Sequence, residues 1–397
     1  MFVGGLPAHS VSAVMPLPEG ISEIKFAGIL GNRRFRYFYE DGFCMSADAD
    51  FIITGEIYPH ETKPEGPFGD HLGYYSLQHP FPVMRIHKVF AKKNAIWAFT
   101  VVGRPPQEDT SFGTLIHELT GNAVQAEING LKEVHAVDAA GVHPLLLVLG
   151  SERYTPYNPT KKPAELLTVA NHILGTGQLS LAKFLFITAE AEKPLSVYRI
   201  EEFFIHILER IDWRSDVHFY TSTTMDTLDY SSTSLNFGSK VVFAAYGEKK
   251  RELCTEVPQA LKTLSGFENA KLVMPGVVAL QPVLNFKFQI SNLQEQLKTY
   301  NSQLTTCPLI ILCDDAGFVA ADLKNFLWVT FTRSNPSHDI YGVDEFSENK
   351  HWGCNGSLII DARIKPHHAP VLEKVPEIEK RVDKLFNKGG SLYGMMK

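Results

Sequence analysis

The stretch from Glu65 to Tyr75 contains residue types that could carry out acid-base chemistry. Two carboxylates, Glu65 and Asp70, stand five residues apart, with two glycines and a proline between them. Glycine and proline favour a tight, shaped turn, so we expect a loop between strands that can bring both acids to one pocket. In a cleft of low dielectric, one acid of such a pair can stay ionised while the other donates a proton. A solvated turn without chemistry is the alternative that composition alone favours.

The elements that would position this loop are predicted from short apolar runs separated by Gly, Pro, Asn and Asp. Within residues 1 to about 105 these runs are Ile24 to Ile29, Arg34 to Tyr39, Asp50 to Ile57, Val83 to Phe90 and Ala95 to Val102. They predict an antiparallel barrel or sandwich. From Asp109 the apolar residues recur at helical spacing, which predicts a helix that leads out of this part.

The rest of the chain has the alternation typical of an α/β protein. Expected strands are Pro144 to Leu149, Phe184 to Thr188 and Leu309 to Leu312, and expected helices are 163–173, 199–211, 256–265, 290–300 and 320–331. The tail from Val371 to Phe386 is expected to form an amphipathic helix that packs on a partner or on its own domain.

A weak internal similarity suggests that the α/β part contains a duplicated unit. The run Phe184 to Thr188 matches Leu309 to Cys313, and the segment ending near Asp216 matches the one ending near Asp339. Chance similarity between two strand-helix-strand units is the competing explanation.

Composition excludes several classes of function. The formal net charge is -6, whereas a nucleic-acid or anionic-membrane surface would need clustered Lys and Arg. The five cysteines are odd in number, widely spaced and without a CxxC, which predicts reduced thiols in a cytoplasmic protein. No run approaches about 18 consecutive apolar residues, so no integral membrane segment is expected. The first residues indicate a strand that enters a turn directly, as if the domain were cut.

Other polar clusters are weaker signals. His367 with His368, and the trio His351, Cys354 and Cys307, lack repeated ligand spacing and are expected to be surface or core residues rather than zinc ligands. The run Cys313-Asp314-Asp315 ends a predicted strand, a place where α/β folds put ligands, but capping of the helix that follows is the expected role.

The acidic segment, Glu65-Gly-Pro-Phe-Gly-Asp-His-Leu-Gly-Tyr-Tyr75, closely resembles the signature loop of the UbiD decarboxylase family. Upstream, Ala13-Val-Met-Pro-Leu-Pro-Glu-Gly-Ile-Ser-Glu23 is similar to the family's Met-Pro-x-Pro turn and the acidic residue after it. Segments beginning at Lys183 and at Leu235 resemble the family's C-terminal domain, so the resemblance covers about residues 1 to 245. Beyond that, segments such as the one starting at Trp352 are similar only to the long, menaquinone-type members.

The resemblance implies a prenylated-FMN-dependent carboxy-lyase. Substrate, an aromatic or α,β-unsaturated carboxylic acid, would form a covalent adduct with the cofactor and lose CO2. By position, Asp70 would be the proton donor, Glu65 the acid that partners an arginine, and Glu23 a ligand to a divalent Mn or Mg, with K as a further candidate. Backbone that lines the cofactor would come from Ala13, Val14, Met15 and Pro16.

For the fold, the resemblance implies an α+β protein. Residues 1–125 would be the C-terminal part of a prenylated-FMN-binding split β-barrel of the flavin-reductase type, followed by an α/β oligomerisation domain (126–250) and a C-terminal α/β extension (251–397). Implied partners are a UbiX-type flavin prenyltransferase that supplies the cofactor and further copies of the chain in a homo-oligomer. A role in ubiquinone or menaquinone biosynthesis follows by analogy alone.

The chain departs from the family pattern in one major respect. The Asn, His and Arg that complete the metal site and the catalytic network lie, in the family, ahead of the point where this sequence begins. No family motif surrounds Arg34, Arg36, Arg85 or Arg104. We therefore expect a piece of a longer enzyme; the alternatives are a missing half from another polypeptide, a non-catalytic scaffold subunit, or a simple FMN-binding reductase. A smaller departure is Asp70, where many members have Glu.

Overall fold

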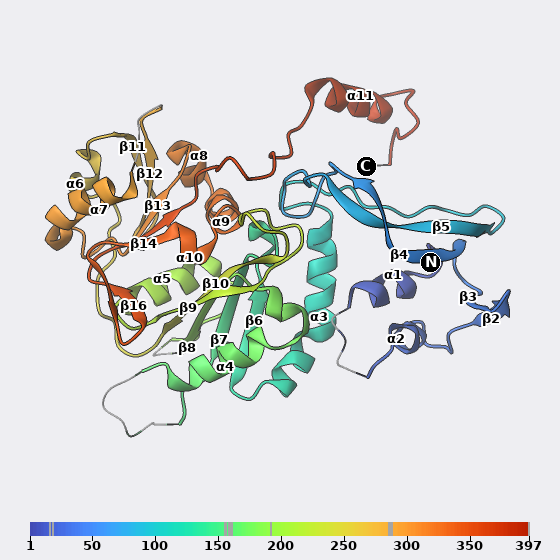
Figure 1. The fold of residues 1–397 in the computed structure, drawn as a ribbon, viewed down its shortest axis with the longest axis horizontal. Helices are drawn as coiled ribbons and strands as arrows, with labels where there is room; N and C mark the ends of the chain where they lie inside the picture. The colour runs from blue at the N-terminus through green and yellow to red at the C-terminus, as the bar shows by residue number, and fades with distance from the viewer. Residues whose placement is uncertain are drawn as a thin grey trace.

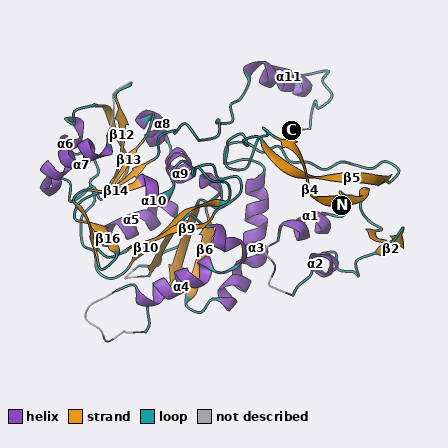
Figure 2. Ribbon diagram, viewed as in Figure 1, coloured by secondary structure: helices purple, strands orange, loops and turns teal. Residues whose placement is uncertain are grey.

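The protein's structure, a computed structural model, describes residues 1–15, 17, 20–154, 157, 162–190, 193–284 and 289–395, apart from the side chains of residues 109 and 120–123. Figure 1 shows a long N-terminal hairpin beside helix α3 and, on the other side of this helix, two α/β units. Figure 2 shows strands surrounded by helices in both units.

The N-terminal part is built on one long antiparallel hairpin. Its elements are β1 (Phe2–Val3), α1 (Pro7–Val14), α2 (Glu23–Leu30), β2 (Tyr37–Glu40), β3 (Phe43–Ser46), β4 (Phe51–Glu65) and β5 (His79–Ala91). Strands β1, β4 and β5 form one sheet in that order, and β2 pairs with β3. The hairpin runs from the pair Phe51 and Ala91 to the pair Glu65 and His79. The acidic loop therefore closes the hairpin, as its turn residues predicted.

Two of the strands expected in this part are not strands. The run Ile24 to Ile29 lies in helix α2, which begins after Ser22 with Glu23 in its first turn and buries Ala27. The isoleucines suggested a strand, but an acid at the start of a helix is favoured by the helix dipole, and apolar residues at 24, 27 and 30 share one helical face. Residues 95–102 form no strand in the described structure. The mixture of helices and separate sheets confirms the α+β class. The sheets described here are open, so the split barrel stays a proposal.

Helix α3 (Asp109–Glu127) leads into the first α/β unit and confirms the helix expected from Asp109. The unit contains β6 (Leu131–Ala136), β7 (Leu145–Gly150), α4 (Ala164–Leu174), β8 (Phe184–Ala189), α5 (Ile200–Arg210), β9 (Val217–Thr224) and β10 (Phe237–Ala245), with short 3-10 turns η1 (Asp138–Ala140) and η2 (Gly177–Leu181). The sheet order is β6-β7-β8-β10-β9. Every residue of β7 and β8 is buried, because helices cover both faces of these parallel strands.

The second α/β unit has its own five-stranded sheet, in the order β11-β12-β13-β17-β14. Its strands are β11 (Phe267–Met274), β12 (Val277–Pro282), β13 (Leu309–Leu312), β14 (Ile340–Gly342) and β17 (Leu358–Asp361), with a separate β15 (Glu345–Glu348) and β16 (His351–Cys354) hairpin. Its helices are α6 (Gln259–Lys262), α7 (Ile290–Thr299), α8 (Ala316–Ala321), α9 (Leu323–Thr332) and α10 (Pro336–Asp339), with η3 (Asn301–Gln303). A hydrophobic core runs between the two units, with Phe186, Phe204 and Phe331 at its centre.

The two sheets have the same topology. In each, the first pair of strands is antiparallel, the next two pairs are parallel and the last pair is antiparallel. The matched aspartates also make the same contact: Asp216 Oδ2 accepts from the Asp212 N–H at 2.8 Å, and Asp339 Oδ2 accepts from the Asn335 N–H at 2.6 Å. These shared features support the duplication, which we retain as a proposal.

Helices expected in the α/β part are confirmed, with two differences in extent. The helix expected at 256–265 is only α6, which begins after Pro258. The helix expected at 320–331 is divided into α8 and α9 by Asp322, whose side chain accepts a hydrogen bond from the Lys324 N–H and so starts a new helix. The cap expected from the run Cys313-Asp314-Asp315 is confirmed: the Asp315 side chain accepts from the Phe318 N–H at the start of α8.

The C-terminal helix α11 (Pro376–Phe386) confirms the amphipathic helix expected in the tail. None of its residues is buried, and Ile378, Val382 and Leu385 are exposed. Figure 1 shows α11 apart from the two α/β sheets, on the side of the β4–β5 hairpin. Within the described residues, no helix combines the length and the apolar character that a bilayer-spanning segment requires.

Two partly buried histidines should make the fold acid-sensitive. Burial, helped by Arg210, lowers the pKa of His206 to about 4, and burial, helped by His351, lowers the pKa of His218 to about 4. Because an unfolded histidine titrates near 6.5, the unfolded chain binds more protons between these values, so stability present above pH 6.5 is lost as the pH falls toward 4. Because both rings are partly exposed and solvent screens their charge, we expect each histidine to cost less than about 1 kcal/mol between pH 7 and pH 5.5. Urea unfolding at both pH values checks this, and His206→Gln should flatten the dependence; an unchanged slope would exclude His206 as its source.

Candidate active site at the acidic loop

The loop between β4 and β5, residues 66–78, folds back on itself. The Asp70 N–H donates to the Tyr74 carbonyl at 3.1 Å, and the Ser76 N–H donates to the Phe68 carbonyl at 2.8 Å. Gly73 has a φ of +85°, and a Cβ there would lie 2.9 Å from the Cα of Arg104. Glycine is therefore required at this turn, both for its backbone conformation and for its close neighbour.

The acidic loop is anchored on elements far away in the sequence. Trp328 Nε1 in α9 donates to the Leu72 carbonyl at 2.8 Å, and the Tyr74 hydroxyl lies 2.7 Å from Thr332 Oγ1. The Tyr75 N–H donates to the Pro370 carbonyl at 2.7 Å. The second α/β unit thus holds the loop that the N-terminal hairpin presents.

Replacing Trp328 with Phe should loosen this anchor while keeping an aromatic ring stacked on Tyr74. The substitution leaves the buried Leu72 carbonyl without its donor, which should cost about 1–3 kcal/mol. Hydrogen exchange should rise over residues 66–78. Trp213→Phe is a matched control, because Trp213 Nε1 donates to the Pro308 carbonyl at 3.0 Å away from the loop. Equal exchange in the two variants would show that Trp328 does not fix the loop.

The two predicted catalytic acids lie in different surroundings. Glu65 ends β4, is exposed, and its carboxylate makes no hydrogen bond or ion pair with the described residues. Asp70 is only 7% exposed; its Oδ1 accepts from the His71 N–H at 2.7 Å and contacts His71 Nδ1 at 2.9 Å. Its Oδ2 has no hydrogen-bond partner among the described residues. The structure therefore shows no direct contact between the carboxylates, and their sharing of one pocket remains a prediction.

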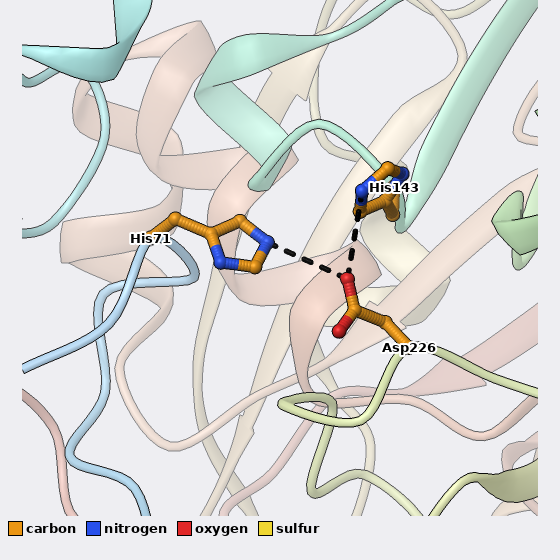
Figure 3. A group of neighbouring side chains, drawn as sticks. All are labelled: His71, His143 and Asp226. Atoms are coloured by element: carbon orange, nitrogen blue, oxygen red, sulfur yellow. Dashed lines mark ion pairs between the residues drawn. The ribbon is translucent and has the colours of Figure 1, made fainter. Parts of the chain in front are cut away.

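His71 connects Asp70 to two further residues that the sequence analysis did not single out. Asp226 Oδ2 lies 3.6 Å from His71 Nε2 and 3.6 Å from His143 Nε2. Figure 3 shows the three side chains pointing toward one another, with the Asp226 carboxylate between the rings. His71 comes from the acidic loop, His143 from the turn before β7, and Asp226 from the segment after β9. We call His71, His143 and Asp226 the His-Asp-His cluster.

The carboxylates around His71 favour a positive charge at this place. Burial opposes that charge, but attraction to Asp226 and Asp70 outweighs it and raises the pKa of His71 to about 10. Burial also opposes the charge of Asp226, yet the two histidines lower the pKa of this carboxyl to about 2. For His143, burial dominates and lowers its pKa. The cluster thus holds an ionised carboxylate between two imidazole rings. The negative charge of this carboxylate attracts a proton or a cation to the rings.

Two arginines lie near the acidic loop. Arg333, only 8% exposed, donates from Nε to the Tyr74 hydroxyl at 3.1 Å. The exposed Arg104 lies beside Gly73, with its guanidinium carbon 5.1 Å from the ring centre of Trp328. Of the other arginines considered, Arg36 pairs with Asp48 and Arg85 with Glu61. No arginine among the described residues forms an ion pair with Glu65 or Asp70.

A small cavity of about 20 Å³ lies where the acidic loop meets the two α/β units. Tyr74 borders it from the loop, Ser231 from the first unit, and Thr332, Arg333 and His368 from the second. This volume holds about one water molecule. With Leu72, Leu228 and Ala369 also in its lining, the cavity is a small, mainly apolar junction that is too small for a substrate.

The residues expected to bind cofactor and metal lie around α1 and α2. Ala13 and Val14 end α1 and are exposed, Met15 follows and is buried, and Pro16 lies outside the described residues. Glu23 is exposed in the first turn of α2, without an ion pair to a described residue. Their roles remain predictions.

The weaker zinc candidates do not gather in the described structure. Cys307 and Cys354 are buried in apolar cores, and His351 packs against His218. Within the described residues, the His-Asp-His cluster is the group with the donors and spacing for a metal. Only its His71 belonged to a motif visible in the sequence.

A folded-back acidic loop, presented by a hairpin and held by two α/β units, defines this chain as an α+β protein with a buried carboxylate site. Family models match two parts of it: the 3-octaprenyl-4-hydroxybenzoate carboxy-lyase Rift-related domain over residues 1–105, and the C-terminal domain of the same family over residues 110–245. The chain belongs to the UbiD carboxy-lyase family.

Among curated relatives, a protein from Chlamydia pneumoniae that is named as one subunit of a 4-hydroxybenzoate decarboxylase is 34% identical over 391 residues. The match covers 98% of this chain but only 63% of that protein.

Among solved structures, the closed form of vanillic acid decarboxylase from Sedimentibacter hydroxybenzoicus is similar, with 19% identity and a TM-score of 0.53, over 67% of this chain and 54% of that one. This likeness concerns the fold. An evolved dimeric UbiD-class enzyme from Pelotomaculum thermopropionicum, solved with prFMN, is 17% identical with a TM-score of 0.45, over 66% of this chain and 55% of its own. That likeness is too distant to position a cofactor here.

Proposed function

We propose that this chain forms the larger part of a decarboxylase that removes CO2 from an aromatic or α,β-unsaturated carboxylic acid with prenylated FMN. The observation that carries the proposal is the burial of Asp70 and the contacts of its two carboxylate oxygens. It lies buried in the family's signature loop, with Oδ1 held by His71 and Oδ2 without a described partner. A carboxyl fixed through one oxygen presents its other oxygen in a defined direction, as proton transfer to carbon requires.

The cofactor would supply the electron sink that no side chain provides for the carbanion left by CO2 loss. The chain's residues fit part of such a site. Met15 is buried, while Ala13 and Val14 expose their surface at the end of α1, where a ring could lie against them. Asp70 Oδ2 would then be the atom that passes the proton to the carbon, and the anchoring of its loop by Trp328 keeps this oxygen in place.

The metal proposed for the cofactor phosphate fits Glu23 only in part. Its exposed carboxylate, which pairs with no described residue, is the hard oxygen donor that Mg or Mn prefers. Such ions take about six oxygen ligands, and Glu23 supplies one or two. Further ligands would come from phosphate, water and other residues.

The partners, the metabolic role and the cellular location follow from the family and remain proposals. A flavin prenyltransferase would supply the cofactor, and the substrate would be a small carboxylic acid, with quinone biosynthesis as one context. The exposed apolar residues of α11 support a homo-oligomer, because an amphipathic helix gains stability when its apolar face is covered. A cytoplasmic location agrees with five free cysteines.

The test is to purify the chain from cells that also express a flavin prenyltransferase, then record its absorption spectrum and the mass of bound cofactor. We expect retained prenylated FMN, and CO2 release when aromatic and α,β-unsaturated acids are screened. Val14→Asp should reduce retention, whereas Ile57→Asp, at an exposed position on the hairpin, should not. A protein that binds no cofactor would contradict the assignment of cofactor contacts to this chain.

A further inference from the structure

The donor atoms of the His-Asp-His cluster are close enough for ion pairs but too far apart for hydrogen bonds. Both nitrogen-to-oxygen distances are 3.6 Å, which is beyond hydrogen-bond length. His71 Nε2 is buried and has no hydrogen-bond partner among the described residues. Buried polar atoms nearly always have one, so this nitrogen indicates that something else belongs beside it.

A metal ion accounts for these distances. Zinc binds histidine nitrogen at about 2.0–2.1 Å and carboxylate oxygen at about 2.0–2.2 Å, and tetrahedral angles then separate two donors by about 3.3–3.5 Å. The two nitrogen-to-oxygen separations of 3.6 Å are close to this, and one donor atom from each of the three residues lies within 4.8 Å of the other two. Two nitrogens and one oxygen suit a divalent first-row metal better than Mg or Ca, which prefer oxygen ligands.

The surroundings of His71 match those of a metal-bound histidine. Its second nitrogen, Nδ1, lies 2.9 Å from Asp70 Oδ1. Metal-binding histidines usually donate this other N–H to a carboxylate, which fixes the ring and its tautomer. Asp226 is positioned independently, because its Oδ1 accepts from the Leu228 N–H at 3.0 Å and leaves Oδ2 for the cluster.

We propose that His71 Nε2, His143 Nε2 and Asp226 Oδ2 bind a divalent metal ion of the zinc type, at a site separate from Glu23. The ion ties the acidic loop to the first α/β unit, because its ligands come from residue 71 in the loop and residues 143 and 226 in the unit. It holds Asp70 indirectly, through the ring of His71. With three protein ligands, a fourth position is open to water.

Cobalt(II) is the probe, because four-coordinate Co²⁺ absorbs visible light strongly and replaces zinc. The protein is stripped with a chelator, titrated with Co²⁺ and then challenged with Zn²⁺. We expect one equivalent of Co²⁺ with intense visible bands that zinc removes. His143→Ala and Asp226→Asn should weaken binding at least tenfold. The amide oxygen introduced by Asp226→Asn can still accept from the Leu228 N–H, so this second variant should keep the fold if His143→Ala does not.

Two matched controls separate this site from others. His206→Ala removes another partly buried histidine whose Nε2 has no hydrogen-bond partner in the described part of the chain. Glu23→Gln removes the ligand proposed for the cofactor-linked metal. Both should bind Co²⁺ like the unaltered protein. No Co²⁺ uptake by the stripped protein, equal uptake in Asp226→Asn, or loss of uptake in Glu23→Gln would each overturn the proposal.

Discussion

Replacing Asp70 with Asn should lower the rate of decarboxylation by about 10²–10⁴-fold, the usual contribution of a positioned general acid. Asn keeps the size of the side chain, and its Oδ1 can still accept from the His71 N–H, so the loop should keep its shape. What is lost is the acidic proton. The rate of CO2 release from the cofactor-loaded enzyme measures the effect, and deuterium incorporation from solvent reports the protonation step.

Asp70→Glu is the matched variant, because it restores an acid with a side chain one methylene longer. It should recover part of the rate that Asn loses, whereas a structural role for Asp70 would make Glu the more disruptive change in this buried position. Glu65→Gln should also reduce the rate, although the Glu65 carboxylate is exposed and makes no polar contact with described residues. If the Asp70→Asn enzyme released CO2 at a rate within threefold of the unaltered enzyme, Asp70 would be excluded as the proton donor.

The parts of the fold that the sequence predicted are those with strong local signals. Buried strands such as β7, β8 and β13 are runs of mainly apolar residues, and the helix cap at Asp315 is a local hydrogen bond. The failures came where local signals are ambiguous. Helix α2 contains isoleucines that also suit a strand, and its helical state depends on the burial of Ala27 against other parts of the fold.

The sequence could predict only those residues of the candidate site that lie within one loop. Glu65, Asp70 and His71 are neighbours in sequence, so a motif can reveal them. His143 and Asp226 lie 72 and 155 residues beyond His71, and nothing in their immediate sequence marks them as its partners. Their contact arises because β7 and β9 belong to one sheet whose turns face the acidic loop. Tertiary packing of this kind leaves no local pattern.

Breaking the buried ion pair beside the acidic loop by removing one partner should strongly destabilise the fold. Lys183 Nζ lies 2.7 Å from Asp229 Oδ2, and the two side chains are 1% and 3% exposed. The ammonium also donates to Ser231 Oγ at 2.9 Å and to the Thr332 carbonyl at 3.5 Å. Burial lowers the pKa of Lys183, although Asp229 opposes this. The pair joins the first α/β unit to the end of α9, which carries the anchor of the loop.

Lys183→Met should therefore cost about 3–5 kcal/mol, because it leaves the Asp229 carboxylate buried without its counterion. Urea unfolding measures the loss. Adding Asp229→Asn should recover part of it, since the neutral amide no longer needs a cation, while Lys132→Met, at the exposed pair with Glu190, should cost under about 1 kcal/mol. If Lys183→Met cost no more than Lys132→Met, water would have to reach Asp229, and the junction between the two units would be more open than its burial indicates.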